Sequence, residues 1–258
     1  MLTSLSKLSF AFTILFSNFF TANPRIIGGE PAARGEFPYI VALRGPNHCG
    51  ATLIRKNWVL TAAHCTGIGT LTATVGLYDE SSPDEGEKFE VEETHVHPKY
   101  NDQVGMDYDF ALLKLKGESS APLAEIDFEP VTDTPDAASP VMATVTGWGW
   151  TGKDGPDPSV LRKVDVPIVA QGECAKAYAK YPGMITDRMI CAGPKEGGKD
   201  SCYGDSGGPL ILNENGKMKQ IGIVSFGPLE GCALPNTYGV YSRISSVADW
   251  IRETIREN

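Results

Sequence analysis

From residue 26 onward the chain is a succession of short runs of β-branched or aromatic residues that are separated by Gly, Pro, Asn and Asp. Six such runs are Tyr39–Leu43, Trp58–Thr61, Phe110–Leu115, Val141–Thr146, Val164–Val169 and Gln220–Phe226. Short strands separated by turn residues are typical of an antiparallel sandwich or barrel. The pattern therefore predicts an all-β fold and leaves the choice between these two architectures open.

Only the end of the chain has the periodicity of an amphipathic helix. Ser246 is positioned to cap its first turn, and charged residues fill the face opposite the apolar one. We expect a packing helix over residues 246–257, and we expect the proline-containing segment 118–139 to connect two β halves. The apolar face consists of Val247, Trp250, Ile251 and Ile255.

Composition and charge narrow the class of protein. With 258 residues, 41% of them hydrophobic and 21% charged, the chain is long enough for one large soluble domain or two small, tightly packed ones. Its 23 Lys and Arg against 32 Asp and Glu give a net charge of −9. Such acidity disfavours nucleic acid and membranes as partners, because anionic surfaces attract basic proteins.

The first 22 residues have the pattern of a cleaved secretory signal. Lys7 supplies a weak positive charge, and residues 8–20 form an apolar run that is too short and too polar to span a bilayer. We therefore expect a secreted, extracellular protein. Its six cysteines, an even number in an exported chain, suggest three disulfides, and their spacing alone does not select the pairing.

Three separate segments carry the residue types of nucleophilic catalysis. They are Thr61–Cys65 (TAAHC), Asp109–Leu113 (DFALL) and Gly204–Pro209 (GDSGGP). A serine hydroxyl becomes a good nucleophile only when a base removes its proton, and that base must be held in one tautomer. Ser206 is the candidate nucleophile, His64 the candidate base, and Asp109 the candidate partner of the other ring nitrogen. The glycine-rich turn would bring the backbone N–H groups of Gly204 and Ser206 to the developing oxyanion.

Taken together, these segments resemble the signatures of the trypsin-like serine proteases of the chymotrypsin fold, in the style of fungal and invertebrate trypsins. Ala-Ala-His-Cys and Gly-Asp-Ser-Gly-Gly-Pro are both intact, and the order His, Asp, Ser differs from that of α/β-hydrolases and subtilisins. The resemblance runs from Ile26 to the C-terminal helix. It implies two packed six-stranded antiparallel β-barrels with a C-terminal α-helix, and a triad of His64, Asp109 and Ser206.

Asp107 is the alternative to Asp109 as the acidic member of the triad. Residues two apart on a strand share a face, so alternation alone does not separate the two. Asp109 begins the Asp-x-Ala-Leu-Leu run that matches the family pattern, and Asp107 lacks it. We therefore assign the role to Asp109.

The resemblance also implies the boundaries of the mature enzyme. Residues 1–22 would be the signal peptide and residues 23–25 a short activation propeptide. The protease domain would cover residues 26–258, with an N-terminal barrel over about 26–128 and a C-terminal barrel over about 129–244.

Five residues correspond to the family's primary specificity pocket. Asp200 matches the acidic residue at the pocket floor, where a buried carboxylate selects a substrate guanidinium or ammonium because it is costly to leave unpaired. Ser201 beside it resembles the arrangement that accepts Lys as well as Arg. Ser225 matches the pocket edge, and Gly227 and Gly239 match wall glycines that leave room for a long side chain. The resemblance thus implies cleavage after Arg or Lys.

Residues 25–29 (RIIGG) resemble the family's activation site. Cleavage after Arg25 would free the α-amino group of Ile26, which in the family inserts and pairs with the Asp before the nucleophile, here Asp205. The resemblance therefore implies a protein made as an inactive precursor.

One disulfide pairing follows from the resemblance. The implied pairs are Cys49–Cys65, Cys174–Cys191 and Cys202–Cys232. The first would staple the His64 loop and the last would brace the pocket beside Asp200.

Two departures from the family pattern lie around the expected pocket. Tyr203, beside Gly204, stands where Gln is usual, and it is expected to crowd or stack on the substrate. Residues 228–230 lengthen the segment before Cys232 by comparison with pancreatic trypsins, which alters the pocket rim.

No cofactor or metal is expected. The acidic residues at 79–87 lie in the region of the family's calcium loop, and carboxylates suit calcium. However, Leu77 occupies what corresponds to the first carboxylate position, so a solvated acidic loop is favoured over a calcium site.

The expected partners are protein or peptide substrates and protein protease inhibitors, and the expected state is a monomer. Two alternatives remain open. One is a protease-fold binding protein that has lost catalysis, although neither a triad residue nor the activation site is missing here. The other is a broad-specificity, collagenolytic relative.

Overall fold

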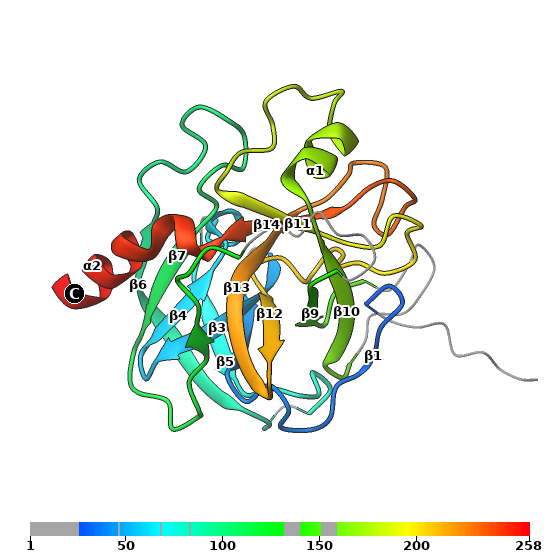
Figure 1. The fold of residues 1–258 in the computed structure, drawn as a ribbon. Helices are drawn as coiled ribbons and strands as arrows, with labels where there is room; N and C mark the ends of the chain where they lie inside the picture. The colour runs from blue at the N-terminus through cyan, green and yellow to red at the C-terminus, as the bar shows by residue number, and fades with distance from the viewer. Residues whose placement is uncertain (1–25, 46, 68, 83, 132–139, 151–158) are drawn as a thin grey trace, which may run out of the picture.

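The chain folds into two β-barrels that lie side by side, followed by a helix at its C-terminal end (Figure 1). This computed structural model describes residues 26–45, 47–67, 69–82, 84–131, 140–150 and 159–258. The predicted signal peptide, the 23–25 propeptide and Arg25 lie outside these residues. Within the described part of the chain, no helix is both long and apolar enough to cross a bilayer.

Six antiparallel strands close the first barrel in the order β2-β3-β4-β7-β6-β5. Because β5 also pairs with β2, every strand has two neighbours and the barrel has no free edge. The strands are β2 (Ile40–Arg44), β3 (His48–Arg55), β4 (Trp58–Thr61), β5 (Thr72–Val75), β6 (Glu87–Val96) and β7 (Ala111–Leu115).

The second barrel has the strand order β9-β10-β11-β14-β13-β12, and β12 pairs back with β9. Its strands are β9 (Met142–Gly147), β10 (Arg162–Val169), β11 (Met189–Ala192), β12 (Pro209–Glu214), β13 (Lys217–Phe226) and β14 (Gly239–Arg243). Two short strands join its outside: β1 (Glu30–Pro31) pairs with β10, and β8 (Glu125–Ile126) runs parallel to β13. The all-β prediction and the two barrels implied by the resemblance are confirmed.

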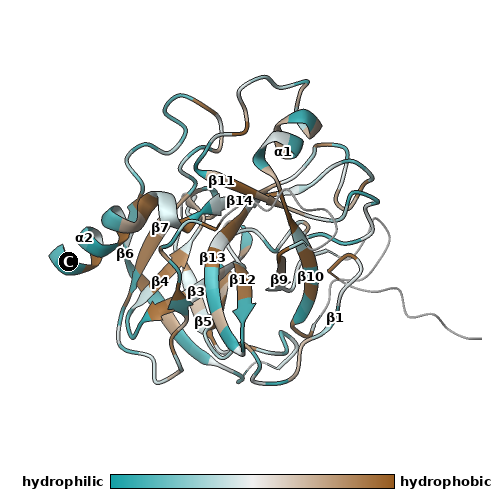
Figure 2. Cartoon of the chain, viewed as in Figure 1, coloured by the Kyte–Doolittle hydropathy of each residue, from teal (hydrophilic) through white to brown (hydrophobic). Residues whose placement is uncertain are grey.

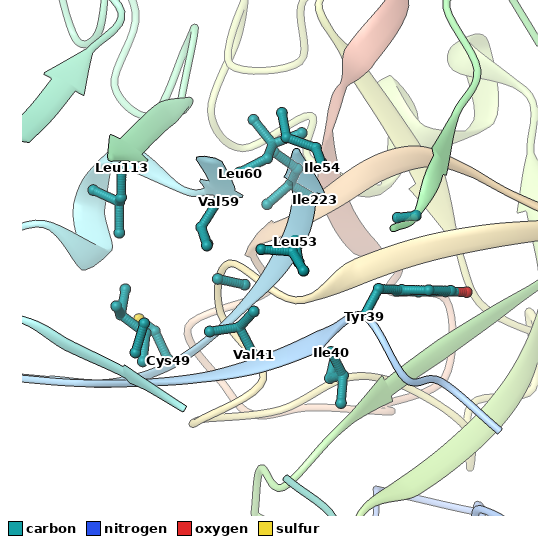
Figure 3. Packing of buried hydrophobic residues seen from close by; sticks show 14 of the residues in the cluster. Tyr39, Ile40, Val41, Cys49, Leu53, Ile54, Val59, Leu60, Leu113 and Ile223 are labelled. Atoms are coloured by element: carbon teal, nitrogen blue, oxygen red, sulfur yellow. The ribbon is translucent and has the colours of Figure 1, made fainter. Parts of the chain in front are cut away.

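The two barrels share part of one hydrophobic core. Strand β6 alternates between half-buried and exposed residues, as expected when one face of a strand meets solvent. In contrast, the first four residues of β2 are all buried. The cluster that contains β2 also includes Ile211 and Ile223 from the second barrel, and Figure 3 shows Ile223 among residues of the first. Burying β2 on both faces therefore fixes one barrel against the other.

Helix α2 (Ala248–Glu257) follows the second barrel but packs on the first, preceded by the 3-10 turn η2 (Ile244–Val247). Ile251 is buried in the shared core, and the Trp250 ring meets His97 with centroids 4.9 Å apart. In Figure 2 the strands carry most of the hydrophobic colour and the outer face of α2 is hydrophilic. The predicted packing helix is therefore present.

The cap predicted for this helix is wrong. Ser246 lies inside η2, where its Oγ donates a 2.6 Å hydrogen bond to the carbonyl of Arg243, and α2 begins at Ala248. The structure also contains a short helix α1 (Gln171–Ala177) that the sequence pattern does not predict. Its N-cap residue, Ala170, makes no side-chain cap, so the usual sequence signal for the start of a helix is missing.

Candidate active site

His64 and Asp109 lie at the same end of two paired strands of the first barrel. His64 sits in the 3-10 turn η1 (Ala63–Cys65), just after β4, and Asp109 lies just before β7. Strands β4 and β7 are antiparallel, with Thr61 opposite Ala111. The end of one strand and the start of the other are therefore neighbours, which brings two residues together that are 45 positions apart in sequence.

The carboxylate of Asp109 fixes the orientation of the imidazole. His64 Nδ1 lies 2.7 Å from Asp109 Oδ2, and the backbone N–H of His64 donates to Oδ1 at 2.9 Å. Asp109 is fully buried, and Ser225 Oγ donates to its Oδ2 at 2.6 Å. Because a carboxylate accepts at Nδ1, that nitrogen carries the proton and Nε2 is left as the basic atom.

Asp107 has a different set of partners from Asp109. Arg188 Nη2 donates to Asp107 Oδ2 at 2.6 Å, and Thr186 Oγ1 donates to Oδ1 at 2.8 Å. The residue between the two aspartates, Tyr108, has a φ of 52°, in the left-handed region that non-glycine residues rarely adopt. This turn breaks strand alternation, so one carboxylate reaches the imidazole and the other reaches the second barrel.

Ser206 lies in a tight turn that presses against the first barrel. Gly207 has a φ of 79°, and a Cβ there would lie 2.2 Å from Thr61 Oγ1, so only glycine fits. The backbone N–H of Gly50 donates to the carbonyl of Ser206 at 2.7 Å, which ties the turn to β3. Ser206, Gly204 and His64 line one cavity of about 810 Å³. Among the residues that the structure describes, Ser206 Oγ makes no hydrogen bond to His64.

All five residues expected in the specificity pocket line a second cavity, of about 340 Å³, together with Ser206 and His64. Asp200 is only 3% exposed; its Oδ2 accepts the Ala233 N–H at 3.0 Å, and its Oδ1 has no hydrogen-bond partner among the described residues. Burial raises the pKa of Asp200 to about 7. A Cβ on Gly239 would lie 2.6 Å from Asp200 Oδ1, so a side chain there would block the carboxylate.

Asp205, next to Ser206, is another buried carboxylate. Its two oxygens accept the backbone N–H groups of Gly149 at 2.8 Å and Cys202 at 2.9 Å. Desolvation raises its pKa to about 7, because these two hydrogen bonds only partly offset the loss of water. Ile26 is fully buried in the core of the second barrel, so the predicted new N-terminus lies in the same half of the molecule as Asp205.

The three disulfides join the pairs that the resemblance implies. They are Cys49–Cys65, Cys174–Cys191 and Cys202–Cys232. The first links β3 to the turn that carries His64, and both cysteines of the third line the Asp200 cavity. Cys49, Cys65 and His64 lie close enough together for a metal ion, but the two sulfurs are bonded to each other and are therefore not available as ligands.

Two carboxylates of the acidic loop at 79–87 have arginine partners. Glu80 forms an ion pair with Arg44, and Glu85 forms one with Arg34. Leu77 is buried in the core instead of facing the loop. These two carboxylates are thus already engaged with groups of the chain itself.

The comparison with known proteins identifies the family. The family model for trypsin matches residues 26–251. The chain belongs to the trypsin family. Trypsin 5G1 of Aedes aegypti is 41% identical over 244 residues, which are 92% of this chain and 87% of that protein. This trypsin-family chain is therefore a serine protease of the chymotrypsin fold, a class that hydrolyses proteins without a cofactor and is typically secreted.

Three features of the site of this trypsin-family chain are not predicted from its sequence. They are the second role of Ser225 as a donor to Asp109, the anchoring of Asp107 by Arg188, and the exposed side chain of Trp150 in the Ser206 cavity. None of them has a local sequence signal, because each contact joins segments that are distant in the chain.

Proposed function

We propose that the protein is an endopeptidase, made as a precursor, that cleaves polypeptides after Arg or Lys through Ser206, His64 and Asp109. The observation that carries the proposal is the buried carboxylate of Asp200. Its Oδ1 has no hydrogen-bond partner among the residues that the structure describes, and it lies in a cavity that also contains Ser206. An unpaired carboxylate in such a site is costly, and a guanidinium or ammonium on a long side chain offsets that cost. Substrates with a cationic residue before the cleaved bond are thereby selected.

The first step is attack by Ser206 Oγ on the carbonyl carbon while His64 Nε2 takes the hydroxyl proton. Asp109 stabilises the imidazolium that forms, because its carboxylate lies 2.7 Å from Nδ1. The N–H groups of Gly204 and Ser206 would donate to the oxyanion, and losing one such donor typically costs about 3–4 kcal/mol of barrier.

The second half of the reaction returns the serine to its starting state. His64 gives its proton to the leaving amine as the C–N bond breaks, which leaves the acyl group on Ser206. A water molecule then attacks the ester carbonyl, with His64 again as the base. The acid is released and the Ser206 hydroxyl is restored.

The precursor form is supported by the environment of Ile26 and Asp205. Ile26 is buried, and its φ of 44° is strained for a β-branched residue that is still joined to residue 25. Cleavage of that peptide bond removes the torsional restriction and creates an ammonium group. An ion pair between this group and Asp205 would satisfy the buried carboxylate and order the neighbouring turn.

Extracellular proteins are the proposed substrates, protein protease inhibitors the proposed partners, and a secreted monomer the proposed state. We also propose that the fold needs no calcium. The ion pairs of Glu80 and Glu85 with arginines support this view.

The proposal is tested with the purified, activated enzyme and four chromogenic peptides that carry Arg, Lys, Phe or Leu before the bond. We expect the Arg and Lys peptides to be cleaved and a serine-directed phosphonate to abolish the activity. Asp200→Ser should lower kcat/KM on the Arg peptide by several orders of magnitude. Equal rates on Phe and Leu would favour the collagenolytic alternative, and no cleavage of any peptide would favour an inactive binding protein.

A further inference from the structure

Two cavities meet at Ser206, and only one of them contains Asp200. His64, Tyr203 and Ser206 line both, so the reacting serine lies where the two cavities join. If the side chain before the cleaved bond occupies the Asp200 cavity, the residues after that bond must continue into the other one. The cavity of about 810 Å³ is therefore continuous with the catalytic cleft on its leaving side.

Two exposed aromatic side chains stand in this leaving-side cavity. Trp150 is 51% exposed and Tyr203 is 60% exposed, unusually high values for such large rings. Their rings meet edge to face, with centroids 5.7 Å apart and an angle of 70° between the planes. An exposed aromatic pair on the wall of a binding cleft offers a surface for another apolar or aromatic group.

Backbone contacts fasten this aromatic pair beside the turn that contains Gly204. The N–H of Trp150 donates to the carbonyl of Tyr203 at 2.6 Å, and the preceding N–H of Gly149 donates to Asp205 at 2.8 Å. A Cβ on Gly204 would lie only 3.1 Å from Gly149 Cα, so the two segments are in close contact. A preformed surface loses less entropy when it binds than a mobile one does.

Charge plays a smaller part in this cavity than apolar surface does. Arg44 and Glu80 also line it, but they form an ion pair with each other, so their charges largely compensate. The remaining exposed polar lining is Asn47 and His48. The aromatic pair is thus the feature with the strongest preference for one kind of side chain.

We propose that Trp150 and Tyr203 form a binding site for the leaving fragment of the substrate. This site selects an aromatic or large aliphatic side chain in the first two residues after the cleaved bond. The inference rests on the proposed function, because it requires cleavage of polypeptides at Ser206.

The test compares quenched fluorescent peptides that share Arg before the bond and differ after it. One series places Phe, Ala or Glu in the first residue after the bond, and a second series places them in the next residue. In at least one series we expect kcat/KM to be about tenfold higher for Phe than for Ala, the size of one good aromatic contact. Trp150→Ala should reduce that ratio to within about twofold.

A substrate with no residue after the bond separates this proposal from the proposed function. An Arg nitroanilide tests the triad and the Asp200 pocket alone, so its hydrolysis reports whether the variant is folded and active. Trp150→Ala should slow the Phe peptide about tenfold more than it slows the nitroanilide. Trp150→Phe should restore the Phe preference, because it keeps an aromatic face.

The matched control is Met142→Ala. Met142 is 46% exposed on β9, the strand that leads towards Trp150, and it lines neither cavity. This variant should keep the wild-type ratio of Phe to Ala. An equal ratio in wild type and Trp150→Ala, with normal nitroanilide hydrolysis, would overturn the leaving-side site and leave the proposed function intact. If the wild-type enzyme did not hydrolyse the Arg nitroanilide at all, the proposed function itself would be overturned.

Discussion

At the scale of single residues, Tyr108 decides which of two buried aspartates meets the imidazole. Its left-handed backbone turns Asp109 towards His64 and Asp107 towards Arg188 of the second barrel. Strained backbone of this kind persists only where the surrounding contacts hold it, and here the Asp107 ion pair is one of those contacts. Anchoring the loop to the other barrel thus also anchors Asp109, which orients the His64 imidazole.

We predict that Asp107→Ala lowers both the stability of the protein and its kcat. The variant leaves Arg188 and Thr186 without their carboxylate, and the loss of such charged hydrogen bonds costs about 2–3 kcal/mol. Denaturant unfolding gives the first quantity and steady-state hydrolysis of an Arg peptide gives the second. The matched control, Asp102→Ala, removes an exposed carboxylate from the same loop and should change neither by much. Identical behaviour of the two variants would show that the anchor is unimportant.

The sequence motifs were enough to nominate residues but not to describe their contacts. His64, Asp109, Ser206 and Asp200 stand in motifs. The structure brings His64, Ser206 and Asp200 to one pair of adjoining cavities, and Asp109 is hydrogen-bonded to His64 from the buried side. Separating Asp107 from Asp109 required a family pattern, because strand alternation treats them alike. The physical reason is the φ of Tyr108, which no local sequence rule predicts for a tyrosine.

At the scale of elements, strands were more predictable than short helices and caps. Apolar runs such as Trp58–Thr61 coincide with observed strands because burial on two faces demands a continuous apolar sequence. Helix α1 is seven residues long and lacks a side-chain cap, so tertiary contacts and the Cys174–Cys191 disulfide hold it in place. Strand β1 was also unpredictable, because it pairs with β10, more than a hundred residues later in the chain.

Among the elements, helix α2 offers the most informative test of how the shared core is held together. We predict that Ile251→Ala lowers the free energy of unfolding by about 2–5 kcal/mol, because Ile251 is 2% exposed in the core shared by both barrels. Glu253→Ala, on the exposed face of the same helix, should change it by less than about 0.5 kcal/mol. Urea unfolding followed by circular dichroism measures both values. A small effect of Ile251→Ala would mean that α2 is only loosely attached.

At the scale of the whole molecule, the buried Asp205 would link the proposed activation to pH. Its pKa is raised by burial to about 7, whereas an aspartate in an unfolded chain titrates near 3.9. At a pH between these two pKa values, the Asp205 carboxyl has already lost its proton in the unfolded chain but keeps it in the folded chain. The group therefore makes the fold less stable as pH rises from about 4 to about 7, and the full penalty is present above that range.

Cleavage after Arg25 should remove this penalty by giving Asp205 an ammonium partner. We predict that the mature form has a higher Tm than the precursor, and that the difference is larger at pH 7.5 than at pH 5. The burial of Asp200 also raises its pKa to about 7, but this residue is the same in both forms and cancels in the comparison. Scanning calorimetry on both forms of Ser206→Ala, which cannot cut itself, measures the difference. A difference that is the same at both pH values would exclude a pairing at Asp205.

Helix α2 also has a consequence for how the molecule is made. A nascent chain that has completed both barrels still leaves the binding place of this helix on the first barrel uncovered, because α2 is translated after them. Until α2 docks, the apolar surface that Ile251 covers stays exposed to solvent. Covering that patch on the first barrel therefore has to wait for a segment that is translated after both barrels.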